Sequence, residues 1–328
     1  MRDMIENHSM KVLVTGARGC IGAWVVRALT NRGVDVVAFD ATGDDTRLRE
    51  ILAPQAWDRI HSVTGAIEDT ALVKSLVCDG GITHIVHLAA VLMPYCQANP
   101  VSGGLINVIG TLNLFEAARD SGRNIRVVYA SSSAVWGPLD EYGEGGVTEA
   151  DHLNPKTHYG VFKQANEGNA RVFYAANGIS SIGLRPYVVY GPGRDSGLTA
   201  DPTLAIRAAA EGRPFQMRLS GFMDLQYVED IAEAFVGCLL SNLEGAHVFN
   251  LQGTVVSMQE IIDMIDDLRP GTRRLLSFDG PQVPVAYRVD DSNLRANIPD
   301  LPKTPLIEGF RRTLAHYEAI HARTAAAG

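Results

Sequence analysis

Residues 11–40, KVLVTGARGCIGAWVVRALTNRGVDVVAFD, constrain the fold more than any other stretch of this chain. A continuous apolar run at 12–14 predicts a strand that is covered on both faces. Three glycines follow, and apolar residues then recur at helical period over 23–29. Residues 34–39 predict a second strand. The order strand, glycine turn, helix, strand predicts a βαβ unit.

The glycine spacing and an acidic residue indicate what this unit binds. Gly16 permits a turn that a Cβ would obstruct, Gly19 lets the backbone approach a pyrophosphate, and Gly22 lets the helix pack closely on the strand. Phosphate oxygens would then lie at the helix N-terminus. Asp40 falls where a carboxylate accepts hydrogen bonds from both ribose hydroxyls and repels a 2′-phosphate, which favours NAD over NADP. The alternative is an ordinary βαβ turn that uses glycine for its geometry alone.

Strands and helices continue to alternate after this unit. We expect strands at 61–65, 83–90, 124–137 and 180–193, and helices at 66–81, 101–122 and 156–178. This alternation predicts an α/β fold with a doubly wound parallel Rossmann sheet, whose ligands bind at the carboxyl ends of the strands.

Beyond residue 193 the alternation loosens, which predicts a smaller α/β C-terminal substrate lobe. Helices are expected at 202–212, 229–242, 257–269 and 305–321, and a strand at 247–253. We therefore predict a disordered extension at 1–10, an NAD-binding Rossmann domain at 11–190, and a substrate-binding lobe at 191–328 from which a segment can return to the first domain. The glycine-rich, acidic segment 137–155 is expected to be a loop over the substrate pocket or a plain surface loop.

Charge and cysteine usage exclude several classes of partner. The net charge of −8 argues against nucleic acid, because no basic stripe is present to neutralise phosphates. No apolar run of membrane-spanning length is apparent, and the polar residues 1–10 lack the apolar core of a signal peptide. The four cysteines and nine histidines show no metal-ligand spacing. We expect no metal, no membrane, reduced thiols and a cytoplasmic location.

Tyr159 and Lys163 are four residues apart on a predicted helix and therefore share a face. A phenol is a poor base at neutral pH, but a neighbouring ammonium and a positive nicotinamide ring would lower its pKa. Such a tyrosine can take a proton from an alcohol while hydride leaves the carbon for NAD. Ser131-Ser132-Ser133 follow a predicted strand, where a hydroxyl can orient the substrate oxygen or merely satisfy the turn.

Several segments together resemble one family, the extended short-chain dehydrogenase/reductases, which includes sugar epimerases, dehydratases and 4-keto reductases. They are TGARGCIG (15–22), HLAA (87–90), NVIGTLNLFEAA (107–118), SSSAVWG (131–137), NPKTHYGVFK (154–163), LRPYVVYGPG (184–193) and YVEDIAEAF (227–235). The resemblance extends from Lys11 to about Tyr317. It implies a homodimer formed through the helices at 101–121 and 156–177.

The resemblance also implies roles for individual residues. Tyr159 is the catalytic acid/base, Lys163 lowers its pKa and binds the nicotinamide ribose, Ser133 orients the substrate, and Asn107 supports the active site. The cofactor-binding residues it implies are Gly16, Gly19, Cys20, Ile21, Gly22, Asp40, Ala66, Ile67, Leu88, Ala89, Ala90, Asn107, Ala130, Tyr159, Lys163, Tyr187 and Val189. His87, at an apolar strand end, is expected to be a packed core histidine rather than a base.

Three departures from the family pattern bear on the substrate. No carboxylate stands at 132–135, where family dehydratases carry an Asp-Glu pair. Val188 replaces the asparagine, and Met223 the diphosphate-binding arginine, of nucleotide-sugar epimerases. Loss of that charge-assisted contact removes about 1.5–3 kcal/mol. Four arginines remain candidates for a smaller anion such as a sugar acid: Arg185, Arg194, Arg218 and Arg288.

The sequence therefore predicts an NAD-dependent oxidoreductase that transfers hydride at a secondary alcohol of a carbohydrate-like substrate, namely a sugar, sugar acid or polyol. The first alternative is an NAD-dependent sugar or nucleotide-sugar epimerase that works through a transient ketone. The second is a non-catalytic NAD-binding regulatory protein, which the presence of Ser133, Tyr159 and Lys163 disfavours.

Overall fold

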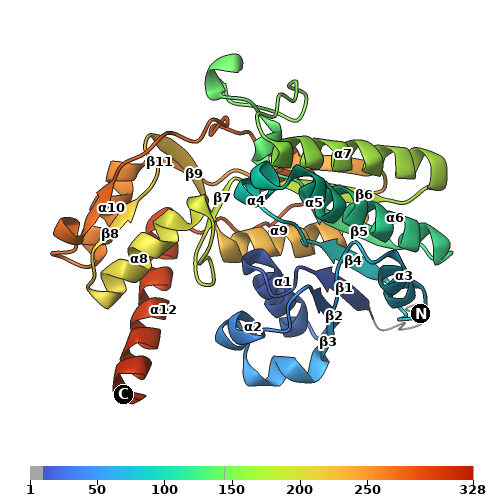
Figure 1. Ribbon diagram of the computed structural model, residues 1–328, viewed down its shortest axis with the longest axis horizontal. Coiled ribbons are helices and arrows are strands. Elements are labelled where there is room, and N and C mark those ends of the chain that lie inside the picture. The colour runs from blue at the N-terminus through green and yellow to red at the C-terminus, as the bar shows by residue number, and fades with distance from the viewer. Residues whose placement is uncertain (1–9, 144, 328) are drawn as a thin grey trace, which may run out of the picture.

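A seven-stranded parallel sheet forms the centre of the computed structural model, which describes residues 10–143 and 145–327 (Figure 1). The strand order is β10-β6-β5-β4-β1-β2-β3. The strands are β1 Lys11–Thr15, β2 Asp35–Asp40, β3 Ile60–Thr64, β4 His84–His87, β5 Arg126–Ala130, β6 Ser181–Arg185 and β10 Ala246–Asn250. The α/β class and the doubly wound parallel sheet predicted from the sequence are confirmed.

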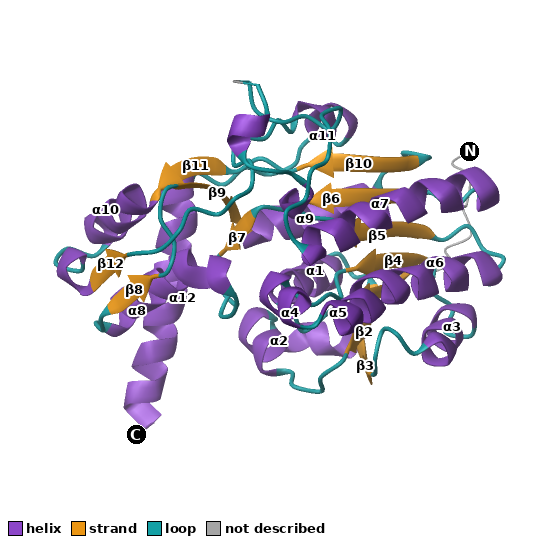
Figure 2. Cartoon of the chain, turned by 45° about the horizontal axis from the view of Figure 1, so that its top comes forward, coloured by secondary structure: helices purple, strands orange, loops and turns teal. Residues whose placement is uncertain are grey.

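Helices cover both faces of this sheet (Figure 2). Val12 and Val14 of β1 pack in a cluster with α1 Cys20–Asn31 and α9 Val228–Leu240, whereas Leu13 packs on the opposite side. That opposite side is covered by α3 Thr70–Cys78, α6 Gly110–Asp120 and α7 His158–Asn177. Because alternate side chains of a strand point to opposite faces, two covered faces require the continuous apolar runs seen in the sequence.

The ends of α7 are set by local sequence. The Thr157 side chain accepts a hydrogen bond from Gly160 N at 3.1 Å, which caps the first turn. Gly178 follows the last turn in the left-handed conformation, with φ of 70°. The helix therefore begins just before Tyr159 and holds it, with Lys163, over the carboxyl end of the sheet.

A second lobe is built from two small sheets and three helices. Its strands are β7 Val188–Tyr190, β9 Phe222–Tyr227 and β11 Thr254–Ser257 in one sheet, with β8 Phe215–Met217 and β12 Leu276–Phe278 in the other. Its helices are α8 Asp201–Glu211, α10 Met258–Leu268 and α12 Leu306–Ala327, which share an apolar cluster with these strands. Between them in sequence, α9 and β10 return to the large sheet, so the lobe is not one continuous segment.

Some local expectations differ from the structure. The expected single strand at 180–193 is two strands in different sheets, because Pro186 interrupts the chain and cannot donate to a ladder. The stretch between the expected strand at 83–90 and the expected helix at 101–122 contains α4 Met93–Ala98, followed by α5 Pro100–Gly104. Two further short helices are α2 Thr46–Ile51 and α11 Ser292–Asn297. The extension expected at 1–10 lies, except for Met10, outside the described residues.

One helical stretch within the described residues, Pro100–Asp120, is long and apolar enough to span a membrane by composition. It comprises α5, a π-helical turn at Leu105–Ile109 and α6. Half of its most apolar window is buried inside the protein. Packing of α6 on the sheet accounts for that apolar character.

Candidate active site

The glycine turn between β1 and α1 has the geometry of an anion cradle. Gly16 has a φ of +67°, and a Cβ there would lie 2.7 Å from Ala89 N. A Cβ on Gly22 would lie 2.0 Å from Gly16 O, whereas one on Gly19 would meet only that same oxygen, at 3.0 Å. Helix α1 then begins at Cys20 without a side-chain cap, so its first N–H groups can donate to phosphate oxygens.

Asp40 ends β2 beside this turn and is partly exposed. Its Oδ2 accepts a hydrogen bond from Arg18 N at 2.9 Å. The Arg18 guanidinium is turned to Asp45, with 2.6 Å between Nε and Oδ1. The Asp40 carboxylate therefore keeps acceptor capacity for ribose hydroxyls, as an NAD site requires.

A crevice of about 440 Å³ runs from the glycine turn to the N-terminal turns of α7. Twelve predicted cofactor residues line it: Gly16, Gly19, Cys20, Ile21, Gly22, Leu88, Ala90, Ala130, Tyr159, Lys163, Tyr187 and Val189. Asp40, Ala66, Ile67, Ala89 and Asn107 do not line this crevice. Arg47, Tyr95 and Asp195, which the sequence reasoning missed, also line it, as do Ser132 and Arg194, which it singled out for other roles. They come from loops and short helices whose positions no sequence periodicity reveals.

Tyr159 and Lys163 lie at the inner end of the crevice, as their spacing on a helix predicts. The Lys163 ammonium lies 5.5 Å from the centre of the Tyr159 ring. It is almost fully buried and donates a hydrogen bond to Ala130 O at 2.7 Å. This bond fixes the lysine against the end of β5.

Burial dominates the electrostatics of this pair. It raises the pKa of Tyr159 to about 12, although the Ser132 hydroxyl and the positive charge of Arg194 act in the opposite direction. Burial also lowers the pKa of Lys163 to about 8. The protein's own residues thus disfavour the phenolate, and the lowering of the Tyr159 pKa by Lys163 together with the positive nicotinamide ring stays a prediction.

The three serines have different surroundings. Ser131 donates to Glu167 Oε1 at 2.5 Å, and Ser133 donates to Pro186 O at 3.1 Å, both buried. Ser132 borders both the cofactor crevice and a second cavity beside it, and its hydroxyl lies close enough to Tyr159 to lower the pKa of the phenol. Ser133 also borders that second cavity. The structure thus brings Ser132 next to the phenol, and the orienting role expected of Ser133 stays a prediction.

The different surroundings of the three serines follow from the extended backbone, in which consecutive side chains point to opposite sides. Ser132 has extended dihedral angles (φ −165°, ψ 150°), so its side chain points away from those of its neighbours. Glu167, which accepts the hydrogen bond from Ser131, forms a two-point ion pair with Arg185, at 2.8 Å for each contact. Both side chains are nearly fully buried, with 1% of Glu167 and 4% of Arg185 exposed, and Glu167 holds the serine turn through Ser131.

Asn107 lies in the π-helical turn and is buried. Its side chain accepts from Val91 N at 3.0 Å and donates to Val91 O at 3.0 Å. It therefore fixes the loop after β4 instead of facing a ligand. A π turn in a helix that adjoins a site is a common way to aim such a group.

His87 occupies a closed network beneath the site. Its Nδ1 lies 2.7 Å from Thr15 Oγ1 and its Nε2 lies 2.9 Å from Thr111 Oγ1. Burial lowers its pKa to about 3, so the ring is neutral. This is the packed core histidine that the sequence favoured.

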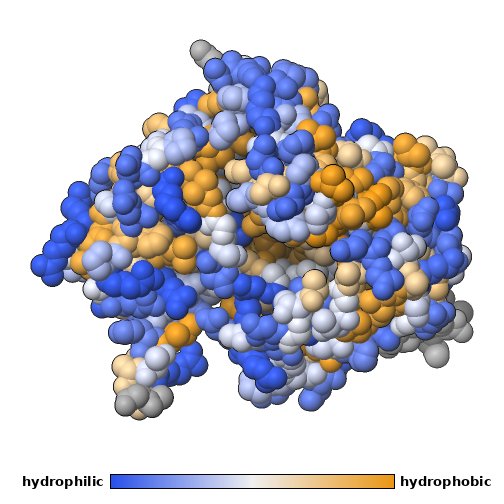
Figure 3. All heavy atoms as spheres, viewed as in Figure 1, coloured by the Kyte–Doolittle hydropathy of each residue, from blue (hydrophilic) through white to orange (hydrophobic). Residues whose placement is uncertain are grey.

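A second cavity of about 300 Å³ adjoins the crevice at Ser132 and Tyr159. The face of the molecule in Figure 3 is hollowed near its centre. The cavity lining is mostly apolar and includes Leu92, Met93, Pro94, Val188, Leu198, Leu219, Pro281, Val283, Pro284 and Val285. Residues 137–155, for which a loop over the pocket and a plain surface loop were both expected, pack on residues 285–289 and border an outer groove, in keeping with the second alternative. Residues 281–285 form the cavity wall.

The positions that depart from the family pattern lie as follows. Met223, in the place of the expected arginine, is fully buried in the core of the second lobe. Val188 is buried and borders the cavity with its apolar side chain. Neither position offers a donor to a diphosphate, so an anionic substrate would need another cation.

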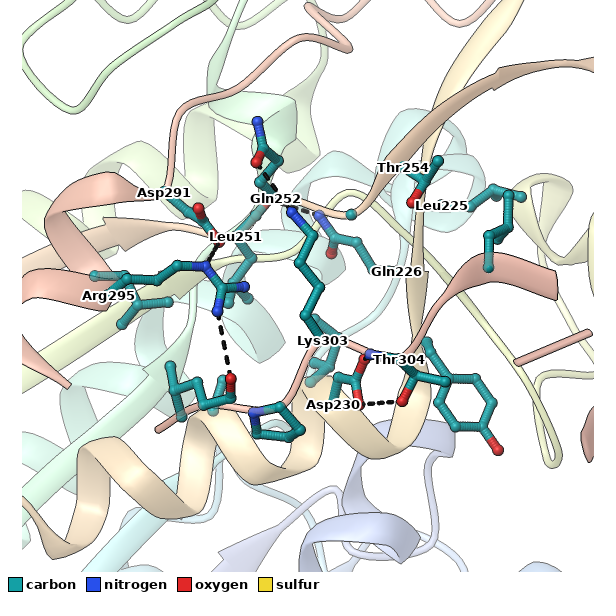
Figure 4. Close-up of a pocket in the computed structure, with 18 of the residues that line it drawn as sticks. Leu225, Gln226, Asp230, Leu251, Gln252, Thr254, Asp291, Arg295, Lys303 and Thr304 are labelled. Carbon is teal, nitrogen blue, oxygen red and sulfur yellow. Dashed lines mark hydrogen bonds and ion pairs between the residues drawn. The ribbon is translucent and has the colours of Figure 1, made fainter. Parts of the chain in front are cut away.

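A small polar cavity of about 40 Å³ is lined by other residues than this site (Figure 4). Its charged groups already have partners within the protein: Asp230 accepts from Thr304, Lys303 donates to Gln252, and Arg295 pairs with Asp291 at 2.9 Å. In the described part of the chain, no group of three or more His, Cys, Asp or Glu side chains could hold a metal ion.

The fold, the glycine cradle and the Tyr-Lys pair define an NAD-dependent enzyme of the extended short-chain dehydrogenase/reductase type. A family model described as "NAD dependent epimerase/dehydratase family" matches residues 12–251, and the chain belongs to that family. The predicted family, the enzyme class and NAD as the cofactor are confirmed.

Relatives of known sequence include sugar-nucleotide epimerases. UDP-glucuronate 4-epimerase 2 of Arabidopsis thaliana is 33% identical over 242 residues, which cover 71% of this chain and 55% of that protein. An uncharacterised 37.6 kDa protein of Escherichia coli O111:H- is 32% identical, covering 69% of this chain and 68% of that protein. The chain spans about half the length of the first of these relatives.

Solved structures agree on the fold. UDP-glucose 4-epimerase of Thermus thermophilus, in complex with NAD, has a TM-score of 0.80 and 26% identity, covering 94% of this chain and 99% of that one. MoeE5 in complex with UDP-glucuronic acid and NAD has a TM-score of 0.78 and 28% identity, covering 94% and 99%. These similarities support an NAD-dependent enzyme of carbohydrate metabolism.

Proposed function

We propose that this chain transfers a hydride between NAD and a secondary alcohol of a carbohydrate-like substrate, with Tyr159 as the acid/base. The observation that carries the proposal is that the Tyr159 phenol, the Ser132 hydroxyl and Lys163 meet where the cofactor crevice joins the substrate cavity. A secondary alcohol in that cavity would lie next to both hydroxyls.

Oxidation of the alcohol needs two transfers. The alcohol O–H proton goes to the Tyr159 phenolate oxygen, and the C–H electron pair leaves as hydride, so the carbinol becomes a ketone. NAD supplies the hydride acceptor and, as its oxidised form, a positive charge. Ser132 orients the substrate oxygen and Lys163 stabilises the phenolate. Because burial raises the Tyr159 pKa to about 12, the catalytic pKa must be reached in the loaded enzyme.

Two outcomes share this chemistry. Net oxidation with release of NADH is supported by the lack of the diphosphate-binding arginine, because Met223 stands in its place and is buried in the core of the second lobe. Epimerisation, in which the hydride returns to the other face of a transient ketone, is supported by the UDP-glucuronate 4-epimerase relatives. The relatives and the solved neighbour support epimerisation better than net oxidation, and net oxidation of a substrate without a nucleotide is kept as the second candidate because Met223 leaves no diphosphate anchor.

Absorbance at 340 nm decides between these outcomes. The enzyme with NAD would be offered sugars, sugar acids, polyols, UDP-glucose and UDP-glucuronic acid. Steady NADH production from a free substrate supports net oxidation, whereas an altered sugar without net NADH establishes epimerisation. In either case Tyr159→Phe should abolish turnover and leave NADH binding intact, while Tyr174→Phe on the same helix should leave turnover unchanged. Full activity of Tyr159→Phe would refute the proposed role.

We also propose a homodimer and an intracellular location. Exposed apolar side chains on the helices expected at the interface, Val101 (79%), Leu105 (48%), Val161 (46%) and Val172 (65%), support the dimer. All four cysteines are free, in keeping with a reducing compartment. Sedimentation should give twice the 35.4 kDa chain mass, and Val101→Asp should shift it to the monomer. A monomeric wild type would refute the dimer.

A further inference from the structure

Arg194 lies at the junction of the two cavities of the site. It follows β7 in the loop 191–197 and borders both the cofactor crevice and the substrate cavity. Its Nη2 donates to Thr199 Oγ1 at 2.9 Å, and its Nε is buried with no hydrogen-bond partner in the described residues. A guanidinium carries five donors, so most of its capacity is unused.

The other cations near the cavity are already engaged. Arg185 is paired with buried Glu167, and Arg218 with Asp201, which is fully buried. Lys156 borders the cavity but binds Glu141 at 2.7 Å, and Lys163 is held by Ala130 O. In the part of the chain that the structure describes, Arg194 forms no ion pair with a carboxylate.

The surroundings of Arg194 in the cavity favour an anionic partner for its guanidinium. The cavity walls are mostly apolar, and in such surroundings a charge-assisted hydrogen bond to an ionised partner is stronger than in solvent. The cavity volume of about 300 Å³ is at the lower limit for ligand pockets, which suits a small molecule. A negative group on such a molecule would complement the Arg194 guanidinium.

We propose that Arg194 binds the carboxylate of the substrate, so that the enzyme acts on a small hydroxycarboxylate of the sugar-acid class. The secondary alcohol lies at Tyr159 and Ser132 while the carboxylate pairs with the guanidinium. A planar carboxylate accepts two parallel N–H bonds from one guanidinium, which fixes the orientation of the carbinol. The substrate class rests on the proposed function, but the carboxylate site is testable by binding alone.

The binding test uses the enzyme–NADH complex and follows cofactor fluorescence. A sugar acid such as gluconate would be titrated against glucitol, a neutral polyol of the same carbon chain. Wild type should bind the acid at least about 10-fold more tightly, and Arg194→Met should abolish this preference. Arg213→Met removes an exposed guanidinium of the same lobe and should retain it. No preference for the acid in wild type, or equal preference in Arg194→Met, would overturn the proposal.

A turnover test separates the two proposals. For whichever sugar acid is oxidised, kcat/KM of Arg194→Met should fall about 10- to 100-fold, mainly through KM, and Arg194→Lys should recover part of the loss. The NADH dissociation constant should change less than about threefold. A parallel loss of NADH affinity would instead assign Arg194 to the cofactor. Oxidation of polyols alone would overturn the acid class and leave the proposed function intact. Tight binding of the acid without turnover of any substrate would support the carboxylate site and overturn the proposed function.

Discussion

Lys163 should make the stability of this protein depend on pH in an identifiable way. Burial lowers the Lys163 pKa from 10.5 to about 8. Because each pKa unit corresponds to about 1.4 kcal/mol, holding this ammonium inside the folded protein costs about 3 kcal/mol at neutral pH. The hydrogen bond to Ala130 O does not remove that cost, since the lysine is still driven toward its neutral form.

The sign follows from proton binding. Between about pH 8 and 10.5 the unfolded chain holds a proton that folded Lys163 has released, so the free energy of unfolding rises with pH. The stability of wild type relative to Lys163→Met should therefore increase by about 2–3 kcal/mol from pH 7 to pH 10. Comparing the two variants cancels all other titrating groups to first order.

Urea unfolding without cofactor, followed by fluorescence at both pH values, measures this difference. Lys74→Met is the matched control, because an exposed bond to Asp120 raises the pKa of Lys74. The free energy of unfolding of wild type relative to Lys74→Met should not increase as the pH rises. If the Lys163→Met and wild-type curves stay parallel from pH 7 to 10, the ammonium is not desolvated and the reasoning fails.

Three further predictions test the serine turn, the ion pair beneath it and cofactor choice. Ser132→Ala should lower kcat about 10- to 100-fold, whereas Ser133→Ala should stay within about threefold; steady-state kinetics that show the reverse order would return the orienting role to Ser133. Glu167→Gln should reduce the free energy of unfolding by about 3–5 kcal/mol in urea, because it leaves the Arg185 guanidinium buried without its charge partner; a loss under about 1 kcal/mol would contradict the buried pair. Asp40→Asn should weaken NAD and strengthen NADP binding, each by about 10-fold in fluorescence titrations, and an unchanged NAD to NADP ratio would remove Asp40 from the ribose site.

Local patterns were sufficient for the main sheet and the cofactor turn. The inner strands of the large sheet are covered on both faces, which leaves a continuous apolar run in the sequence, as in β1 and β2. Gly22 is required by its close contact with Gly16 and Ala17, and Gly16 by its left-handed φ of +67°, and both requirements are local; the close approach of Leu88 and Ala89 to Gly16 adds a distant one. The 159–163 spacing places two side chains on one helical face wherever that helix lies.

Features that depend on distant segments were missed or misassigned. The break at Pro186 separates β6 from β7, and which sheet β7 joins depends on its pairing with β9. Helix α4 is too short to show a period, and the wall formed by 281–285 comes from a stretch with no regular structure.

The sequence by itself determined the doubly wound sheet, the glycine turn of the NAD site and the shared helix face of Tyr159 and Lys163, because these follow from periodicity and from short-range backbone geometry. Only the tertiary structure decided that Ser132 faces Tyr159, that burial raises the Tyr159 pKa, and that Arg194 alone among the four candidate arginines borders the cavity. Those properties depend on desolvation and on partners far apart in the chain. A carboxylate such as Glu167 or Asp201 is adjacent to its arginine only after the chain has folded.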